Sequence, residues 1–196
     1  MHFLCYDGLR EKSLLIFFRQ SFCHPTFFKQ PKMATENIVI RKARPDDAPA
    51  LVEFNKAIAR ETEHIELKHE LISAGVDAIF EKPERGFYIV AEHEGEVVGS
   101  LMVTTEWSDW RNGVFWWVQS VYIVAPMRRK GIYRRLYEHV KQLAEADGGV
   151  CGFRLYVERE NTIAQQTYSA MGMTETPYLV YEELAPGVEF TEPKER

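Results

Sequence analysis

From residue 38 onward, short runs rich in β-branched and aromatic residues alternate with stretches whose apolar residues recur at helical spacing. The strand-like runs cover residues 38–43, 87–91, 97–103, 114–124 and 152–158, followed by a final extended stretch at 173–182. The first helical stretch begins at residues 45–47, and three more cover 67–80, 131–146 and 162–171. Period-two and period-3.6 patterns in this order predict a mixed sheet flanked by helices, an α/β (α+β) fold.

Composition places the chain among globular proteins and removes several function classes. Of its 196 residues, 45% are hydrophobic and 27% are charged, which is typical of a domain with a packed core. The net charge of −5 argues against a nucleic-acid binder, which would carry a basic face. No apolar run approaches the ~18–20 residues of a membrane span, so we expect no membrane partner. Cys5, Cys23 and Cys151 are too scattered for a disulfide framework or a zinc site, so we expect no metal and a reduced, cytoplasmic setting.

The first 32 residues differ sharply in charge from the rest. They carry five basic and two acidic groups, a balance of +3, and six of the chain's twelve Phe residues. Residues 33–196 carry 19 basic and 27 acidic groups, a balance of −8. Three interpretations are open: a targeting segment, a membrane-surface or partner-binding helix, or a dispensable leader before a true start at Met33. We expect a basic, Phe-rich leader over 1–32, disordered or wrongly assigned to the chain, and a single domain over 33–196.

The chemistry is concentrated where the strand-like run at residues 121–124 leads into the helix that begins at Gly131. A helix N-terminus has unsatisfied backbone N–H groups and a partial positive charge, and both attract phosphate. Gly131 allows close backbone approach, and the adjacent residues 128–130 are all basic. The segment fits a pyrophosphate site; the alternative is a turn with a solvated basic patch. The single Gly excludes a Rossmann fingerprint, and the missing Gly-Lys-Ser/Thr ending excludes a P-loop.

The same segment, Arg128-Arg129-Lys130-Gly131-Ile132-Tyr133, resembles the Q/R-x-x-G-x-G/A motif of the GNAT superfamily of acyl-CoA-dependent N-acyltransferases. The stretch Leu155-x-Val157-x-x-x-Asn161-x-x-Ala164-x-x-x-Tyr168-x-x-x-Gly172-Met173 is similar to a second signature of that superfamily, and Arg44-Pro45-x-Asp47 to its first strand–helix entry. Together the resemblance covers residues 38–182. It implies a central mixed, mostly antiparallel, splayed sheet flanked by helices. Tyr133 departs from the pattern, because the superfamily has Gly or Ala at that position.

The resemblance also implies which residues contact acetyl-CoA, the expected co-substrate. Backbone amides of residues 129–134 would hold the pyrophosphate, with Arg128 and Lys130 supplying charge. The strand end at 121–123 would hydrogen-bond the pantetheine arm, which fills the gap where this strand splays from the run at 152–158. Asn161 would contact the same arm. The full set of expected cofactor contacts is Val121, Tyr122, Ile123, Arg128, Arg129, Lys130, Gly131, Ile132, Tyr133, Arg134 and Asn161.

Acyl transfer from a thioester to an amine needs one group that takes a proton and one that gives a proton. A primary amine has a pKa of about 10.4, so a base must deprotonate it, and the departing thiolate must gain a proton. The resemblance puts Tyr168 near the thioester sulfur, and we expect it to be the general acid; the alternative is a core tyrosine. Many relatives place a Glu where this chain has Gln119, which cannot be a base. We expect Glu106 as the base, with alternatives at Asp109, Glu61, Glu63 and His64.

Four tryptophans, Trp107, Trp110, Trp116 and Trp117, lie within eleven residues. Aromatic faces beside acidic groups suit an amine or ammonium ligand, and an acidic body attracts cations. We expect an N-acetyltransferase that moves an acetyl group from acetyl-CoA to a primary amine of a small molecule or peptide, by direct attack in a ternary complex. The alternative is a non-catalytic acyl-CoA-binding or interaction module with the same fold. For Trp116 and Trp117 an alternative is open, in which they alternate between the core and the surface of a homodimer.

Overall fold

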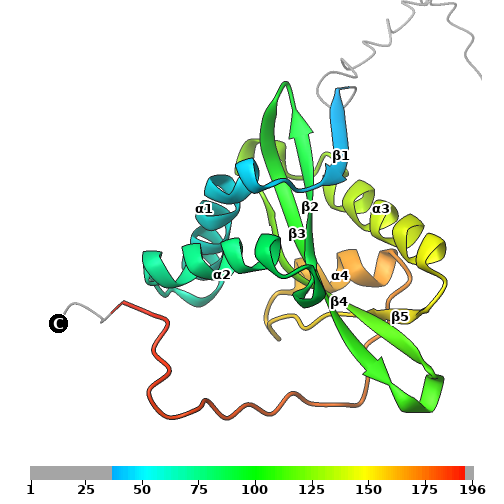
Figure 1. Ribbon diagram of the computed structural model, residues 1–196. Coiled ribbons are helices and arrows are strands. Elements are labelled where there is room, and N and C mark those ends of the chain that lie inside the picture. The colour runs from blue at the N-terminus through cyan, green and yellow to red at the C-terminus, as the bar shows by residue number, and fades with distance from the viewer. Residues whose placement is uncertain (1–36, 193–196) are drawn as a thin grey trace, which may run out of the picture. The chain divides into compact units, whose positions relative to one another are not determined.

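The structure is a computed structural model that describes residues 37–192, so the leader predicted at 1–32 lies outside the described residues. Five strands form one sheet in the order β1-β2-β3-β4-β5 (Figure 1). They are β1 (Ile38–Lys42), β2 (Phe87–His93), β3 (Glu96–Ser108), β4 (Gly113–Ile123) and β5 (Val150–Arg154). Neighbouring strands are antiparallel except β4 and β5, which are parallel. The predicted mixed, mostly antiparallel sheet is confirmed.

Helices flank this sheet in the predicted order. The α-helices are α1 (Ala48–Ile58), α2 (His69–Glu81), α3 (Ile132–Asp147) and α4 (Thr162–Ala170). A π-helical turn, η2 (Ala59–Glu63), continues α1. Short 3-10 turns are η1 (Pro45–Asp47), η3 (Pro83–Arg85), η4 (Asp109–Arg111) and η5 (Ala125–Met127).

The two faces of the sheet bury alternate residues of the same strands. On β2, Ile89 belongs to the core beneath α3, whereas Tyr88 and Val90 belong to the core beneath α1 and α2. Successive side chains of a strand point to opposite faces, so one short strand supplies both cores. Figure 1 shows α1 and α2 on one side of the sheet and α3 on the other.

A cluster of charged residues joins the first strand to the first helix. The guanidinium of Arg41 donates to the two carboxylate oxygens of Asp47 at 2.7 and 2.9 Å, and to Glu92 on β2 at 2.8 Å. Asp47 is buried and also accepts from the backbone N–H of Arg44 at 2.7 Å. These bonds, above all the one from Arg41, lower the pKa of Asp47. Because Asp47 ends η1, the cluster fixes the direction in which the chain enters α1.

The strand β4 contains a β-bulge near its end. Met102 pairs with Gln119 and Ser100 pairs with Tyr122, so β4 has one more residue than β3 between these two pairs. Ser120 lies in this interval with a φ of 48°, a conformation that is uncommon for a residue other than Gly. Such a bulge interrupts the hydrogen-bond ladder and increases the local twist of the strand.

The strand β5 ends earlier than the sequence predicts. The prediction extended from 152 to 158, but β5 ends at Arg154, which pairs with Trp117 as the last pair between β4 and β5. Residues 118–123 of β4 therefore have no partner on β5. The sequence misplaces this boundary because residues 150–157 are mostly apolar, and the end of pairing depends on the divergence of the two strands.

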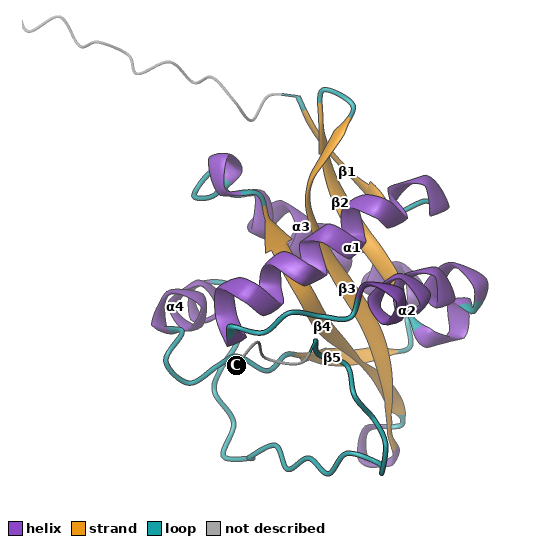
Figure 2. Cartoon of the chain, turned by 90° about the vertical axis from the view of Figure 1, so that its left-hand side faces the viewer, coloured by secondary structure: helices purple, strands orange, loops and turns teal. Residues whose placement is uncertain are grey.

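After α4 the chain forms no further helix or strand within the described residues, so the stretch predicted at 173–182 adds no strand to this sheet. We call residues 174–189 the strap. Figure 2 shows it as a long loop that leaves the end of α4 and stands off the body. Its far end is attached near the start of α2, where Thr191 bridges to Leu67 and the Lys68 N–H donates to the Phe190 carbonyl at 3.0 Å. Within residues 37–192, no helix has both the length and the apolar character of a membrane span.

Candidate active site

The start of α3 lacks a side-chain cap. Gly131 is the N-cap residue, with φ 75° and ψ 12°, a left-handed conformation that Gly adopts readily. The N–H of Arg135 donates to the Gly131 carbonyl at 3.2 Å, and the N–H groups of residues 132–134 precede this first helical bond. A Cβ built on Gly131 would meet no described atom within 4 Å. The turn therefore offers backbone N–H groups beside open space, as an anion site requires.

Arg128 contacts the protein itself. Its Nε donates to the carbonyl of Ile123 at 2.8 Å, and its guanidinium forms an ion pair with Glu61 of η2 at 2.7 Å. The same guanidinium lies over the ring of Tyr122, whose hydroxyl donates to Glu61 at 3.0 Å. Arg128 thus joins the end of β4 to η2, and its predicted role toward pyrophosphate would require it to serve both partners or to leave Glu61.

The other cations near the turn have different surroundings. Arg129, Lys130 and Arg134 are all exposed, and the Nζ of Lys130 lies 3.5 Å from the sulfur of Met127. Arg129 has a φ of 62°, so two of the three residues before α3 are left-handed. A shallow hollow of about 240 Å³ adjoins this region and is lined by Arg134, Glu138, Lys141, Ala170 and Met171.

The open end of β4 lies directly before this turn. Val121, Tyr122 and Ile123 are partly buried, and they belong to the part of β4 that β5 leaves unpaired. Only Val124, the turn η5 and residues 128–131 separate them from α3. The structure therefore brings together an unpaired strand edge and an uncapped helix start.

Tyr168 of α4 faces α3 and packs against Tyr133. Their ring centroids are 5.5 Å apart in an edge-to-face arrangement, and Tyr133 in turn stacks on Tyr137 with centroids 6.1 Å apart. Burial raises the pKa of the Tyr168 hydroxyl, so this hydroxyl stays protonated at neutral pH. The ring of Tyr133, the departure from the motif, packs against the core beneath α3, and its buried hydroxyl has no hydrogen-bond partner among the described residues.

Asn161 is the N-cap of α4. Its Oδ1 accepts a hydrogen bond from the backbone N–H of Ala164 at 3.1 Å. This bond satisfies one of the free N–H groups at the helix start and orients the side chain. The side-chain amide NH₂ remains as the group with which Asn161 would contact a cofactor arm.

Glu106 of β3 is held by two donors. The indole N–H of Trp117 donates to one oxygen, and Arg154 of β5 donates to both oxygens at 2.7 and 2.9 Å. These bonds, led by the one from Trp117, lower the pKa of Glu106, which makes it a weaker proton acceptor. In the strand register Glu106 is opposite Phe115, on the paired side of Trp117 rather than on the open end of β4.

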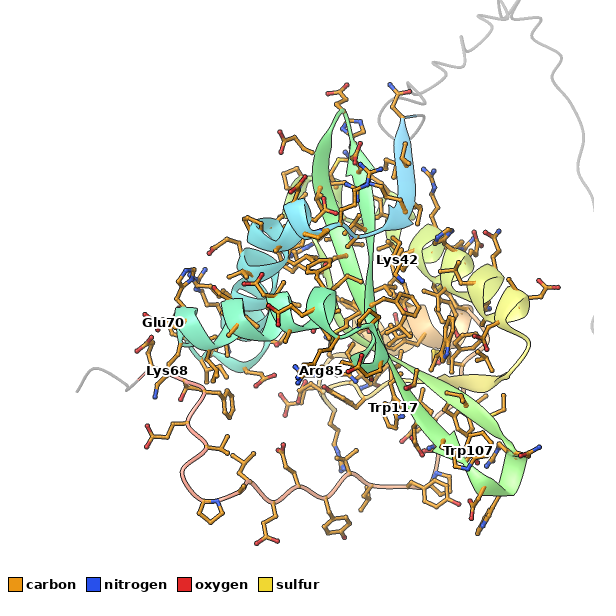
Figure 3. All side chains as sticks on the ribbon, viewed as in Figure 1. Lys42, Lys68, Glu70, Arg85, Trp107 and Trp117 are labelled. Atoms are coloured by element: carbon orange, nitrogen blue, oxygen red, sulfur yellow. The ribbon has the colours of Figure 1, made fainter. Side chains whose placement is uncertain are left out.

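The four tryptophans do not form one cluster. Trp116 is buried and packs edge-to-face on Phe87, whereas Trp107 and Trp110 are 62% and 87% exposed. Figure 3 shows Trp117 closer to the body of the protein and Trp107 farther out along the β3–β4 hairpin. Trp116 therefore belongs to the core, as the alternative interpretation allowed, and Trp117 is the member that lies where β4 and β5 separate.

Two residues near this point were not singled out from the sequence, Arg154 and Tyr156. Arg154 lies over the Phe115 ring at 3.8 Å, and the Tyr156 ring is 6.3 Å from that of Trp117. Burial raises the pKa of Tyr156, and the nearby charges of two carboxylates, Glu63 and Glu182, raise it further. The sequence does carry a signal for Arg154, which is a charged residue inside the apolar run 150–157.

Among residues 37–192, no group of His, Cys, Asp and Glu is arranged to hold a metal ion.

A diverging parallel strand pair beside a glycine turn and an uncapped helix defines an acyl-CoA N-acyltransferase fold. A family model described as Acetyltransferase (GNAT) family matches residues 49–173. The chain therefore belongs to the GNAT acetyltransferase family, which supports acyl transfer from acetyl-CoA as its general activity. Among curated proteins, none matches the chain significantly.

Solved structures agree with this assignment. A possible acetyltransferase from Clostridium difficile 630 is 43% identical with a TM-score of 0.71, and the match covers 76% of this chain and 99% of that one. A predicted acetyltransferase with acetyl-CoA from Clostridium acetobutylicum is 14% identical with a TM-score of 0.63, covering 74% and 96%. AAC(6')-Iy in complex with the bisubstrate analog CoA-S-monomethyl-acetylneamine is 14% identical with a TM-score of 0.63, covering 76% and 98%. The last two share the fold alone.

Proposed function

We propose that this protein moves an acetyl group from acetyl-CoA to a primary amine of a small molecule or peptide, by direct attack in a ternary complex. One observation carries the proposal: the unpaired edge of β4 leads into the uncapped start of α3. An unpaired edge offers backbone hydrogen-bonding groups to an extended amide-containing arm, and a helix start offers N–H groups to pyrophosphate. Acetyl-CoA carries these two groups next to each other.

The proposed cofactor contacts follow from this arrangement. The backbone of Val121, Tyr122 and Ile123 would hold the pantetheine arm, and the amides of residues 129–134 would hold the pyrophosphate. The exposed cations Arg129 and Arg134 would add charge at the turn. Bound in this way, acetyl-CoA supplies the activated acyl carbon.

The reaction then needs two proton transfers. The amine nitrogen gives up a proton to a base and forms a bond to the acyl carbon, the carbon–sulfur bond breaks, and the sulfur gains a proton from an acid. We assign Tyr168 as the donor, because its hydroxyl is protonated at neutral pH and α4 packs beside α3. For the base, Glu106 competes with Glu61, which lies beside Tyr122 at the open end of β4.

The acceptor is proposed to be a cationic amine. Tyr156 and Trp117 are in ring contact, and the carboxylates of Glu63 and Glu182 are close enough to affect the pKa of Tyr156. Aromatic rings next to carboxylates attract ammonium groups. The charge balance of −8 over residues 33–196 would favour the approach of such an acceptor.

The sharpest test of the cofactor site compares two glycines at opposite ends of α3. Gly131 and Gly148 have φ values of 75° and 76°, and a Cβ on either would meet no described atom within 4 Å. The variants G131A and G148A should therefore lose similar stability, about 1–2 kcal/mol each. If pyrophosphate binds at the start of α3, only G131A should raise the KM for acetyl-CoA, by about tenfold for each 1.4 kcal/mol of lost binding. Equal KM values for the two variants would contradict the site.

Activity is tested by measuring CoA release from acetyl-CoA with polyamines, amino acids and lysine peptides. Release that depends on one class of amine supports the proposed reaction and identifies the acceptor. Tight binding of acetyl-CoA with no release on any amine would instead identify a non-catalytic acyl-CoA-binding module.

A further inference from the structure

The helix α4 carries Tyr168, yet little of this helix contacts the body of the protein. None of its nine residues is buried, and only Ala164, Gln165 and Tyr168 are partly buried. The hydrogen bonds that α4 forms with described residues all stay within residues 158–173. No apolar residue of α4 is among the described residues that pack against the core beneath α3. The orientation of Tyr168 therefore depends on a side chain from another element.

Tyr133 of α3 connects Tyr168 to that core. The two rings meet edge to face, with centroids 5.5 Å apart and an interplanar angle of 66°, and among residues 37–192 no other ring contacts Tyr168. Tyr133 also packs against the core beneath α3 and stacks on Tyr137, which is 2% exposed. Tyr137 in turn meets Phe153 of β5 edge to face, with centroids 5.6 Å apart. We call these four rings the aromatic ladder, which runs from α4 across α3 to the sheet.

The ladder holds the Tyr133 ring in place. Residue 133 lies in the first turn of α3, so the helix fixes its backbone, while Tyr137 and the core fix its ring. An edge-to-face pair has a preferred geometry, because the positive edge of one ring meets the negative face of the other. A fixed Tyr133 ring therefore limits the positions that Tyr168 can take. A Gly or Ala, which the superfamily has at this position, could not make the contact.

We propose that Tyr133 is a positioning residue, which holds Tyr168, and with it α4, in the orientation needed to protonate the departing sulfur. The inference rests on the proposed function, in which Tyr168 is the general acid. A displacement of about 1 Å within an active site can lower the rate by about 10²-fold. The ring of Tyr133 makes the contact, since its hydroxyl has no partner among the described residues. Phe should therefore replace Tyr133 in this role, and Leu should not.

The test compares Y133L with Y133F and with a matched control, F87L, in the full chain. Phe87 is likewise a ring that packs against the core beneath α3, and it meets Trp116 edge to face with centroids 5.3 Å apart. Y133L should lower kcat by about 10–10²-fold with little change in the KM for acetyl-CoA. Y133F should recover most of this loss, and F87L should keep the wild-type kcat. An unchanged kcat in Y133L, or an equal decrease in F87L, would overturn the inference.

A double variant shows whether Tyr133 acts through Tyr168. If it does, adding Y133L to Y168F should lower kcat no further, because the group that Tyr133 positions is already absent. A merely structural role would lower the kcat of Y168F by the same factor as that of the wild type, which would overturn the inference. An unchanged kcat in Y168F alone would refute the general acid and this inference together. A decreased kcat in Y168F with an unchanged kcat in Y133L would refute this inference and leave the proposed function standing.

Hydrogen exchange gives a readout that does not require activity. Losing one aromatic contact should raise the exchange rates of the amides of residues 165–170 by about 2–12-fold in Y133L. The same amides should exchange at the wild-type rate in F87L. Unchanged exchange of α4 in Y133L would show that Tyr133 does not hold this helix, and would overturn the inference.

Discussion

Replacing Tyr133 by Phe removes one oxygen atom from the interior of the protein. The Tyr133 hydroxyl is buried without a hydrogen-bond partner in residues 37–192, and burial raises its pKa far above the usual range for a phenol. A buried hydroxyl that lacks a partner costs about 1–3 kcal/mol of stability. The Y133F variant should therefore unfold with a free energy larger by this amount, whereas most substitutions decrease it.

The measurement is thermal and urea unfolding of the wild type and Y133F. For a domain of this size, 1 kcal/mol shifts Tm by about 2–4 °C, so Tm should rise by about 2–12 °C. Y137F is the matched control, because the Tyr137 ring stacks on Tyr133 at an interplanar angle of 7° and its hydroxyl is not an unsatisfied buried atom. A fall in the Tm of Y133F, or a rise no larger than that of Y137F, would mean that the hydroxyl has a partner in the folded protein.

Four further substitutions, with D46N as a control, test the charged cluster and the proposed proton transfers. D47N should lower the free energy of unfolding by about 2–4 kcal/mol at pH 7, whereas the exposed D46N should not, because a buried carboxylate that pairs with Arg is lost. The folded-state pKa of Asp47 is lowered, so its contribution is complete above the unfolded value of about 3.9 and disappears as the pH falls through the folded value. Urea midpoints of the wild type and D47N should thus converge at low pH; a constant gap would contradict this. Y168F should lower kcat by about 10²–10⁴-fold with little change in the KM for acetyl-CoA, and an unchanged kcat would exclude the general acid. Of E61Q and E106Q, the one that replaces the base should abolish the rise of kcat with pH, and the other should retain it.

The helices are predictable because burial on one face leaves a period in the sequence, and the first four strands because β-branched and aromatic residues are concentrated in them. On α3, Ile132, Leu136 and Val140 recur at helical spacing, and each is at most 1% exposed. The glycine turn before α3 is predictable for a related reason, since Gly131 takes a left-handed conformation that its residue type allows. The signal is local in both cases.

The contacts around the candidate site depend on residues that are far apart in the sequence. Arg128 pairs with Glu61, 67 residues earlier, and Arg154 pairs with Glu106, 48 residues earlier. Nothing in the local sequence shows that these charges are already paired with one another. The direction of the Tyr133 ring follows from its stacking on Tyr137, one helical turn later, and the motif at residues 128–133 does not include that partner.

The end of β5 at Arg154 determines how much of β4 is left open. Had β5 continued to Glu158, as its sequence predicts, it would pair with the end of β4 and occupy the backbone groups proposed for the pantetheine arm. The observed length leaves those groups free over residues 118–123 of β4, directly before the glycine turn and the start of α3.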